Sequence, residues 1–130
     1  MKALVTGGAG FIGSHLAEAL CRRGANVVIL DDFSTGADAN LAWRKPGDAV
    51  EVIPGAVEDP VVVRQAVVGC DWVFHEAALV SGPLSIEQPV ESHRRNVIGT
   101  LELLTAARVA GVRRFVLASS SAVYGENPAP

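Results

Sequence analysis

A short apolar segment that ends in a run of glycines opens this chain and limits the folds it can adopt. Residues 1–6 read Met-Lys-Ala-Leu-Val-Thr, and Gly-Gly-Ala-Gly-Phe-Ile-Gly follows at residues 7–13. A buried parallel strand that ends in a tight turn has this pattern. Apolar residues then recur at helical spacing up to Gly24, a residue suited to end a helix, and residues 26–31 form a second apolar segment. The opening of the chain therefore predicts a strand, a helix and a parallel strand.

The spacing of the glycines predicts a site for the pyrophosphate of a dinucleotide. Gly7, Gly10 and Gly13 would provide a tight turn, a backbone that an anion can approach, and close packing of helix on strand. The N-terminus of the following helix would add N–H groups and the positive end of its dipole. Two alternatives are a glycine turn that only packs the helix and a P-loop, which requires a lysine where this chain has Ser14.

An acid at the end of the second strand supports this interpretation and favours NAD over NADP. Asp31 lies 18 residues after Gly13, close to the spacing at which an acidic residue hydrogen-bonds the adenosine ribose. Its carboxylate would repel a 2′-phosphate, and residues 32–36 contain no arginine that would bind one. We therefore expect NAD as the cofactor.

Strands and helices continue to alternate along the rest of the chain. This alternation predicts an α/β Rossmann fold with a doubly wound parallel sheet of strand order 3-2-1-4-5, whose ligands gather at the carboxyl ends of the strands. The further elements that we expect are a short helix within 32–45, a strand at 50–53, a helix at about 59–68, a strand at 71–75, a Gly-Pro loop at 82–83, a helix at about 89–110 and a strand at 114–118.

Charge and composition disfavour several other classes of function. The formal net charge is −3 and the basic residues form no block, so nucleic acid is a poor candidate partner. No segment approaches the roughly 20 apolar residues that span a bilayer, and the N-terminus does not resemble a signal peptide, so we expect no membrane and a cytoplasmic location. The three histidines lie too far apart in sequence to suggest a metal site, and we expect none.

Five motifs in order resemble the extended short-chain dehydrogenase/reductases, in the branch of NAD-dependent nucleotide-sugar epimerases and dehydratases. The resemblance covers the whole chain and corresponds to the N-terminal part of that family. Its motifs are the glycine turn at residues 6–16, Asp-Asp-Phe-Ser-Thr-Gly at 31–36, His-Glu-Ala-Ala at 75–78, Asn-Val-Ile-Gly-Thr at 96–100, and Ser-Ser-Ser-Ala-Val-Tyr-Gly at 119–125.

The resemblance implies roles for individual residues. Ser120 matches the catalytic Ser/Thr that hydrogen-bonds the sugar oxygen being oxidised, with Ser121 as the alternate; a solvated turn is the plainer interpretation of the three serines. Asp31 and Asp32 would meet the adenosine ribose, Val57 the adenine, and Asn96 would brace the site. The other cofactor contacts that we expect come from Phe11, Ile12, Ser34, Thr35, Gly36, Ala77, Ala78 and Ser119.

Three departures from the family pattern limit what the resemblance implies. Ala56 stands where the family has an acid that contacts adenine, so adenine binding would be looser or differently arranged. Ser121 and Ala122 replace the Asp-Glu pair of the dehydratases, which favours epimerisation or simple redox chemistry. The family's Tyr-x-x-x-Lys is absent, because Pro128 stands four residues after Tyr124, and with it the base that takes the substrate hydroxyl proton.

The resemblance therefore implies an NAD-dependent nucleotide-sugar epimerase, similar to UDP-glucose/galactose 4-epimerases, that removes and returns hydride at sugar C4. We expect residues 1–130 to form an incomplete NAD-binding domain without a C-terminal substrate lobe, inactive alone, from a full-length protein that forms a homodimer. The alternatives are a non-catalytic NAD-binding module and a related nucleotide-sugar reductase, dehydratase or decarboxylase.

Two further groups of residues in the second half of the chain have a predicted place in the fold. The arginines at 94–95 and 113–114 are expected on solvated faces, although Arg94 or Arg95 could lie near a partner. The apolar stripe Val97, Leu101, Leu104 and Val109 is expected chiefly in the core.

Overall fold

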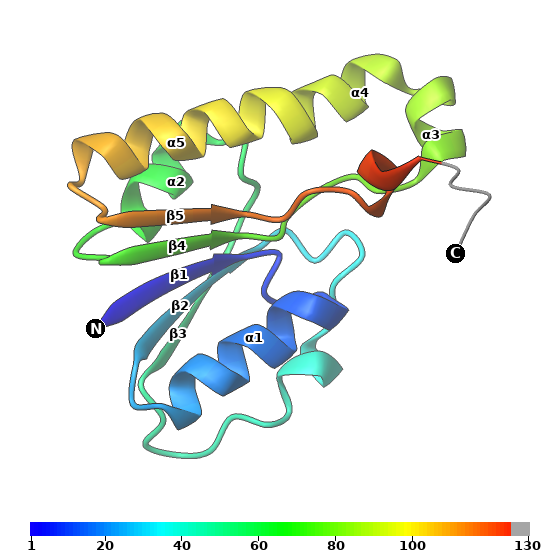
Figure 1. Ribbon diagram of the computed structural model, residues 1–130. Helices are drawn as coiled ribbons and strands as arrows, with labels where there is room; N and C mark the ends of the chain where they lie inside the picture. The colour runs from blue at the N-terminus through cyan, green and yellow to red at the C-terminus, as the bar shows by residue number, and fades with distance from the viewer. Residues whose placement is uncertain (126–130) are drawn as a thin grey trace.

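Five parallel strands form the central sheet of the computed structural model, which describes residues 1–125 except for the side chain of Ser121 (Figure 1). The sheet order is β3-β2-β1-β4-β5, which confirms the predicted doubly wound topology. The strands are β1 (Lys2–Thr6), β2 (Asn26–Asp31), β3 (Val50–Pro54), β4 (Trp72–His75) and β5 (Arg114–Leu117).

The register of the strands brings their carboxyl ends to one edge of the sheet. Thr6, the last residue of β1, pairs with Leu30 of β2 on one side and with His75 of β4 on the other. His75 in turn pairs with Leu117, the last residue of β5. The segments that follow β1, β2, β3 and β4 therefore leave the sheet side by side, at the edge where a doubly wound fold binds its ligands.

Helices cover both faces of the sheet and enclose two separate cores (Figure 1). The α1 helix (Phe11–Arg22) covers one face, where Ala17 and Leu20 pack with Val5 and Ile29. The α2 helix (Pro60–Ala66) and the α5 helix (Gly99–Val109) cover the other face, where a second apolar cluster includes Leu4, Val63 and Leu103. Because both faces are covered, β1 and β2 are apolar along nearly their whole length.

The long helical region predicted at about 89–110 is present, but it consists of three consecutive elements. It begins as α4 (Pro89–His93), widens into a π-helical turn, η2 (Arg94–Ile98), and continues as α5. A π turn adds a residue to the helical repeat and so changes the direction of the side chains around it. The Gly-Pro loop predicted at 82–83 is wrong, since Gly82–Glu87 form the short helix α3.

The expectation that the apolar stripe of the long helix is core is wrong as well. Val97, Leu101, Leu104 and Val109 are all exposed, with relative accessibilities between 43% and 79%. The buried face of α5 instead consists of Gly99, Leu103, Ala106 and Ala107, which follow a spacing of four, three and one residues. Small residues on this face let α5 lie close to α2, and Leu103 is its one large aliphatic side chain.

Two 3₁₀ turns complete the described chain. The first, η1 (Asp38–Leu41), lies within the region where a short helix was predicted and places Leu41 in the core below α1. The second, η3 (Ser121–Tyr124), follows β5 at the ligand-binding edge of the sheet (Figure 1). Within residues 1–125, no helix is both long enough and apolar enough to cross a membrane.

Candidate functional site

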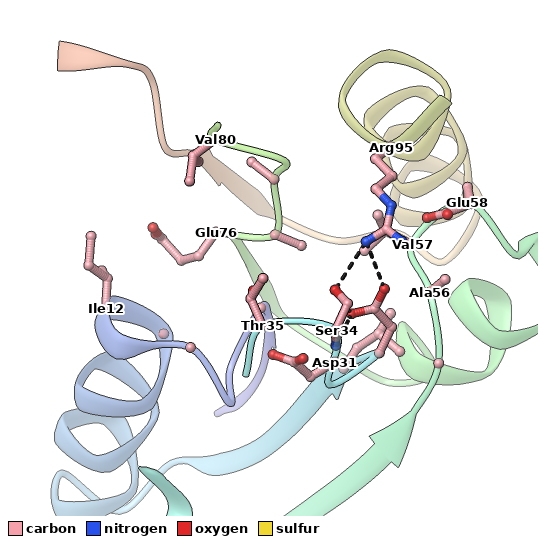
Figure 2. A pocket seen from close by; sticks show the side chains of 18 of the residues that line it. Ile12, Asp31, Ser34, Thr35, Ala56, Val57, Glu58, Glu76, Val80 and Arg95 are labelled. Carbon is pink, nitrogen blue, oxygen red and sulfur yellow. Dashed lines mark hydrogen bonds and ion pairs between the residues drawn. The ribbon is translucent and has the colours of Figure 1, made fainter. Parts of the chain in front are cut away.

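A cavity of about 310 Å³ opens at the carboxyl edge of the sheet. Four connecting segments form its walls: the glycine turn after β1, the loop after β2, the segment after β3 and the loop after β4 (Figure 2). The volume lies within the usual range for small-molecule sites. Its lining residues are Gly7, Gly10, Phe11, Ile12, Gly13, Leu30, Asp31, Asp32, Ser34, Thr35, Gly55, Ala56, Val57, Glu58, Glu76, Ala77, Ala78, Val80 and Arg95.

The glycine turn is too tightly packed to accept side chains at two of its positions. Gly7 has a φ of +65°, and a Cβ atom there would lie 2.8 Å from the backbone nitrogen of Ala77. A Cβ atom on Gly13 would collide with the carbonyl oxygen of Gly7. The turn leads directly into α1, whose first N–H groups have no partner within a helix. This is the geometry that a pyrophosphate requires, so the residues present fit a dinucleotide.

The Asp31 carboxylate links the glycine turn to the loop after β2. Its Oδ2 accepts a hydrogen bond from the Ala9 backbone N–H at 2.8 Å, and its Oδ1 accepts one from the Phe33 N–H at 2.8 Å. The side chain is buried among these groups, with 6% of the residue exposed. Each oxygen retains a second acceptor position. Asp31 therefore holds two walls of the cavity together while it can still accept a hydrogen bond from a ribose hydroxyl.

Asp32 is held at the cavity by its neighbour Ser34 and by an arginine from a distant part of the chain. Asp32 Oδ1 accepts hydrogen bonds from the N–H and the hydroxyl of Ser34 at 2.9 and 2.6 Å. Arg95 Nη1 lies 3.1 Å from Asp32 Oδ2 and donates to Ser34 Oγ at 3.0 Å (Figure 2). Partial burial acts most strongly and raises the pKa of Asp32, but the Ser34 hydrogen bonds and the charge of Arg95 together hold this pKa below its ordinary value.

The expectation that Arg94 and Arg95 lie on a solvated face is confirmed for Arg94, whose side chain is half exposed, but is wrong for Arg95, which lines the cavity. Glu91 accepts hydrogen bonds from Arg94 Nε at 2.9 Å and from Arg95 Nε at 2.6 Å, and these bonds lower the pKa of Glu91 to about 2. Arg94 also pairs with the nearly buried Glu58 carboxylate at 2.9 Å. The ion pairs connect the start of the long helical region to the segment after β3, so Glu58 is already engaged beside Ala56, where the family has its adenine-binding acid.

A chain of hydrogen bonds below the cavity fixes the tautomer of His75. Thr100 Oγ1 donates its only proton to the Asn96 carbonyl oxygen at 2.6 Å, so at 2.9 Å it accepts a hydrogen bond from His75 Nε2. His75 Nδ1 then accepts from Thr6 Oγ1 at 2.7 Å, and Thr6 Oγ1 accepts from the Ala77 N–H at 3.3 Å. Burial lowers the pKa of His75 to about 4, which keeps the ring neutral at pH 7.

Asn96 holds the loop after β4 from the helical side. Its Nδ2 donates to the Leu79 carbonyl oxygen at 3.0 Å, and its Oδ1 accepts from the Leu79 N–H at 2.8 Å. This two-point contact is the one through which Asn96 would brace the site. The same loop carries Ala77 and Ala78 into the cavity wall.

The serine segment lies apart from the cavity walls. Ser119 and Ser120 are exposed, and Ser120 Oγ accepts a hydrogen bond from the Ala122 N–H at 3.1 Å, which caps η3. The hydroxyl proton of Ser120 therefore stays available to a ligand. The side chain of Ser121 and the whole of Pro128 lie outside the described residues.

Most of the predicted cofactor residues line one cavity, and a few do not. Gly36 packs behind it, against Ala9 and Asp31, while Asn96 and Ser119 lie outside the lining, as does the predicted catalytic Ser120. Sequence reasoning missed the contributions of three charged residues, Glu58, Glu76 and Arg95, to the lining. Burial raises the pKa of Glu76. The position of Glu76 inside the His-Glu-Ala-Ala motif could have indicated its place in the site. Arg95 is 63 residues from Asp32 in sequence, and no sequence signal indicated that the two are close. The described part of the chain contains no group of His, Cys, Asp and Glu side chains that could hold a metal.

Comparison with known proteins yields consistent matches. A family model described as the NAD dependent epimerase/dehydratase family matches residues 3–130. UDP-glucose 4-epimerase of Klebsiella pneumoniae is 38% identical over 132 residues, which cover 98% of this chain and 95% of that protein. UDP-glucuronic acid decarboxylase 4 of Arabidopsis thaliana is 37% identical over 126 residues, which cover 97% of this chain but only 27% of that protein.

A solved structure shows the same arrangement in three dimensions. The crystal structure of Thermus thermophilus UDP-glucose 4-epimerase in complex with NAD matches this chain with a TM-score of 0.88 at 41% sequence identity. The match covers 98% of this chain and 40% of that one. This chain therefore spans well under half the length of the Thermus and Arabidopsis proteins.

Proposed function

This chain belongs to the NAD dependent epimerase/dehydratase family, and from that membership we propose that residues 1–130 are the NAD-binding part of a nucleotide-sugar epimerase. The observation that carries the proposal is the cavity, which joins the glycine turn, the two acids after β2 and the loop after β4 at one edge of the sheet. The proposed reaction interconverts the C4 epimers of a UDP-hexose such as UDP-glucose. The names of the relatives from Klebsiella and Thermus support a sugar of this kind.

The residues of the chain would hold NAD along the cavity. The glycine turn and the first N–H groups of α1 would bind the pyrophosphate, and Asp31 and Asp32 would accept hydrogen bonds from the adenosine ribose. Val57 would contact the adenine, and the loop with Ala77 and Ala78 would face the nicotinamide side. When bound, the cofactor supplies a site that takes a hydride and returns it.

Ser120 is the residue of this chain that we propose for contact with the sugar. Its Oγ accepts the Ala122 N–H, so its own proton is free to donate to the sugar oxygen at the reacting carbon. Among the described residues no basic side chain hydrogen-bonds this hydroxyl, and in the family the Tyr-x-x-x-Lys pair removes the proton from the sugar oxygen. Because Pro128 stands at the lysine spacing from Tyr124, we propose that residues 1–130 bind NAD but do not turn over sugar alone.

A decarboxylase acting on UDP-glucuronic acid is the second candidate. The Arabidopsis decarboxylase is about as similar to this chain as the Klebsiella epimerase, with 37% against 38% identity. Both reactions begin with removal of hydride from the sugar, so the NAD-binding part does not separate them. A homodimer of the complete protein agrees with the exposed aliphatic residues of α5, Leu101 and Leu104, and with Val97 just before it.

Two measurements test the proposal. Titration of the purified 130-residue chain with NADH, followed by its fluorescence, should give saturable binding, and lack of binding would overturn the proposal. The longest reading frame that contains this chain should then convert UDP-galactose to UDP-glucose without net reduction of NAD. Release of CO₂ from UDP-glucuronic acid would support the decarboxylase instead. Binding of NADH without turnover of any nucleotide sugar would leave a non-catalytic NAD-binding module.

A further inference from the structure

The adenosine end of the cavity combines two groups that discriminate between NAD and NADP in opposite directions. In dinucleotide folds, an acid after the second strand binds the free ribose 2′-hydroxyl, whereas a nearby arginine accommodates a 2′-phosphate. Here Asp32 and Arg95 stand at the same place and form an ion pair of 3.1 Å across the cavity edge. The carboxylate of Asp32 and the guanidinium of Arg95 therefore neutralise each other, and each engages a group that would otherwise face a ligand.

The guanidinium of Arg95 has N–H donors that the described residues leave without an acceptor. Its Nη1 serves Asp32 and Ser34, and its Nε serves Glu91. An arginine has five N–H donors, and the two on Nη2 take part in no hydrogen bond among the residues that the structure describes. With 30% of its side chain exposed at the lining of the cavity, Arg95 is accessible to a ligand.

Ser34 supplies a second donor at the same place. Its hydroxyl currently donates to Asp32 Oδ1 at 2.6 Å and accepts from Arg95 Nη1 at 3.0 Å (Figure 2). Without the Asp32 carboxylate, the Ser34 hydroxyl would lose the acceptor of its proton, and Arg95 would keep only Ser34 Oγ and Glu91 as acceptors. A guanidinium and a hydroxyl are the donors that a phosphate monoester binds well.

We propose that Arg95 is a specificity-determining residue of this cavity, and that Asp32 keeps the cavity selective for NAD by occupying Arg95 and Ser34. Loss of the Asp32 charge would release Arg95 Nη1 to a 2′-phosphate, so the affinity for NADP should rise relative to that for NAD, although the Asp31 carboxylate remains in the cavity. The inference rests on the proposed binding of NAD. It identifies an arginine that is far from the β2 loop in sequence as the partner that determines the selectivity of that loop.

The test compares the dissociation constants of NADH and NADPH by fluorescence titration at low salt. For the unaltered chain we expect tighter binding of NADH. In Asp32→Asn, which removes the charge and keeps the shape, the NADPH-to-NADH affinity ratio should rise at least about tenfold. The double variant Asp32→Asn/Arg95→Gln should lose this gain. Asp71→Asn is the matched control, because Asp71 forms an ion pair with Arg113 at the other end of β4 and should leave the ratio unchanged.

The outcomes separate the inference from the function on which it rests. If the unaltered chain binds neither dinucleotide, the proposed function and the inference both fail. If NADH binds and the ratio in Asp32→Asn changes by less than about threefold, or the gain persists in the double variant, only the inference fails. Circular dichroism verifies folding of each variant, and Asp32→Ser replaces Asp32→Asn under the same criteria if the latter does not fold.

Discussion

The strands β2 and β5 both end at the cavity edge of the sheet, but they differ strongly in how far they are exposed to solvent. β2 lies between β1 and β3, and five of its six residues are buried. β5 lies at one edge of the sheet that residues 1–125 form, and three of its four residues are exposed. The acid that ends β2 is enclosed by two backbone N–H groups, whereas Ser120, just after β5, is exposed.

This contrast teaches that the chain builds the two halves of the site by different means. On the β2 side, buried backbone and side-chain contacts within the chain determine the positions of the binding groups before any ligand arrives. On the β5 side, one hydrogen bond to Ala122 N–H fixes the serine hydroxyl. Substitutions on the first side should therefore affect folding and binding together, and Ser120 substitutions on the second side should change stability only slightly and leave NADH binding unchanged.

The largest effect should come from Gly13, on the closed side. In Gly13→Ala, the added methyl group would collide with the backbone of Gly7 and Gly8, which cannot move without displacing β1. We expect a loss of more than about 5 kcal/mol of unfolding free energy, comparable to the whole stability of a domain of this size. Urea unfolding followed by circular dichroism measures this loss. In Gly82→Ala the added methyl group meets open space, so this control should change stability by less than about 0.5 kcal/mol.

Asp31→Ala should have the next largest effect. The substitution leaves the N–H groups of Ala9 and Phe33 without their carboxylate acceptor in a buried place. Each unsatisfied donor costs about 2 kcal/mol, so we expect a loss of about 4 kcal/mol together with weaker binding of NADH. Asp38→Ala, at an exposed acid, is the control. Equal stability of the two variants would show that Asp31 does not hold the cavity walls together.

The fold and the closed side of the site could largely be predicted from the sequence, because their determinants are local. The run of residues 1–31 contains a strand, a glycine turn, a helix and a strand with an acid at its end, and each follows from neighbouring residues. The strand order then follows from the alternation of strands and helices. The helical region after residue 81 was harder to predict, because a π turn at Arg94–Ile98 changes which face of the following helix is buried, and no local sequence signal indicates this turn.

The contacts of Arg95 could not be predicted in the same way. They depend on the approach of η2 to the loop after β2, which only the folded chain brings together. Two adjacent arginines in a helical segment are typical of a solvated face, and their charge alone does not indicate which acidic residue, 63 positions away, will pair with one of them. The neutral tautomer of His75 likewise depends on Thr6 and Thr100, which lie on separate elements.

His75 lies between the two halves, and its buried ring should make stability depend on pH. The folded state holds the pKa of His75 at about 4, while an unfolded histidine has a pKa near 6.5. Between these values the unfolded state binds more protons, so the free energy of unfolding should fall as the pH is lowered from about 6.5 to 4. For this residue the total fall is about 3 kcal/mol.

Comparison with His75→Gln isolates this contribution from that of the carboxylates. The stability advantage of the unaltered chain over His75→Gln should be greatest near pH 7 and should decrease toward pH 4. Urea unfolding at several pH values measures it. His93→Gln, at an exposed position of α4, should show the pH dependence of the unaltered chain. A constant difference between the unaltered chain and His75→Gln across this range would show that the ring is not held neutral.

The smallest effect should come from Ser120, on the open side. Ser120→Ala removes the cap of η3, an exposed turn that a single hydrogen bond supports, so we expect a loss of about 0.5 kcal/mol and unchanged binding of NADH. In the longest reading frame the same substitution should lower turnover of the nucleotide sugar by at least about tenfold, because in the proposed reaction the hydroxyl donates to the sugar oxygen. Turnover equal to that of the unaltered protein would remove Ser120 from the reaction. Weaker NADH binding by the 130-residue variant would instead show that the β5 side contributes to the cofactor site, and the contrast between the two strands would then fail.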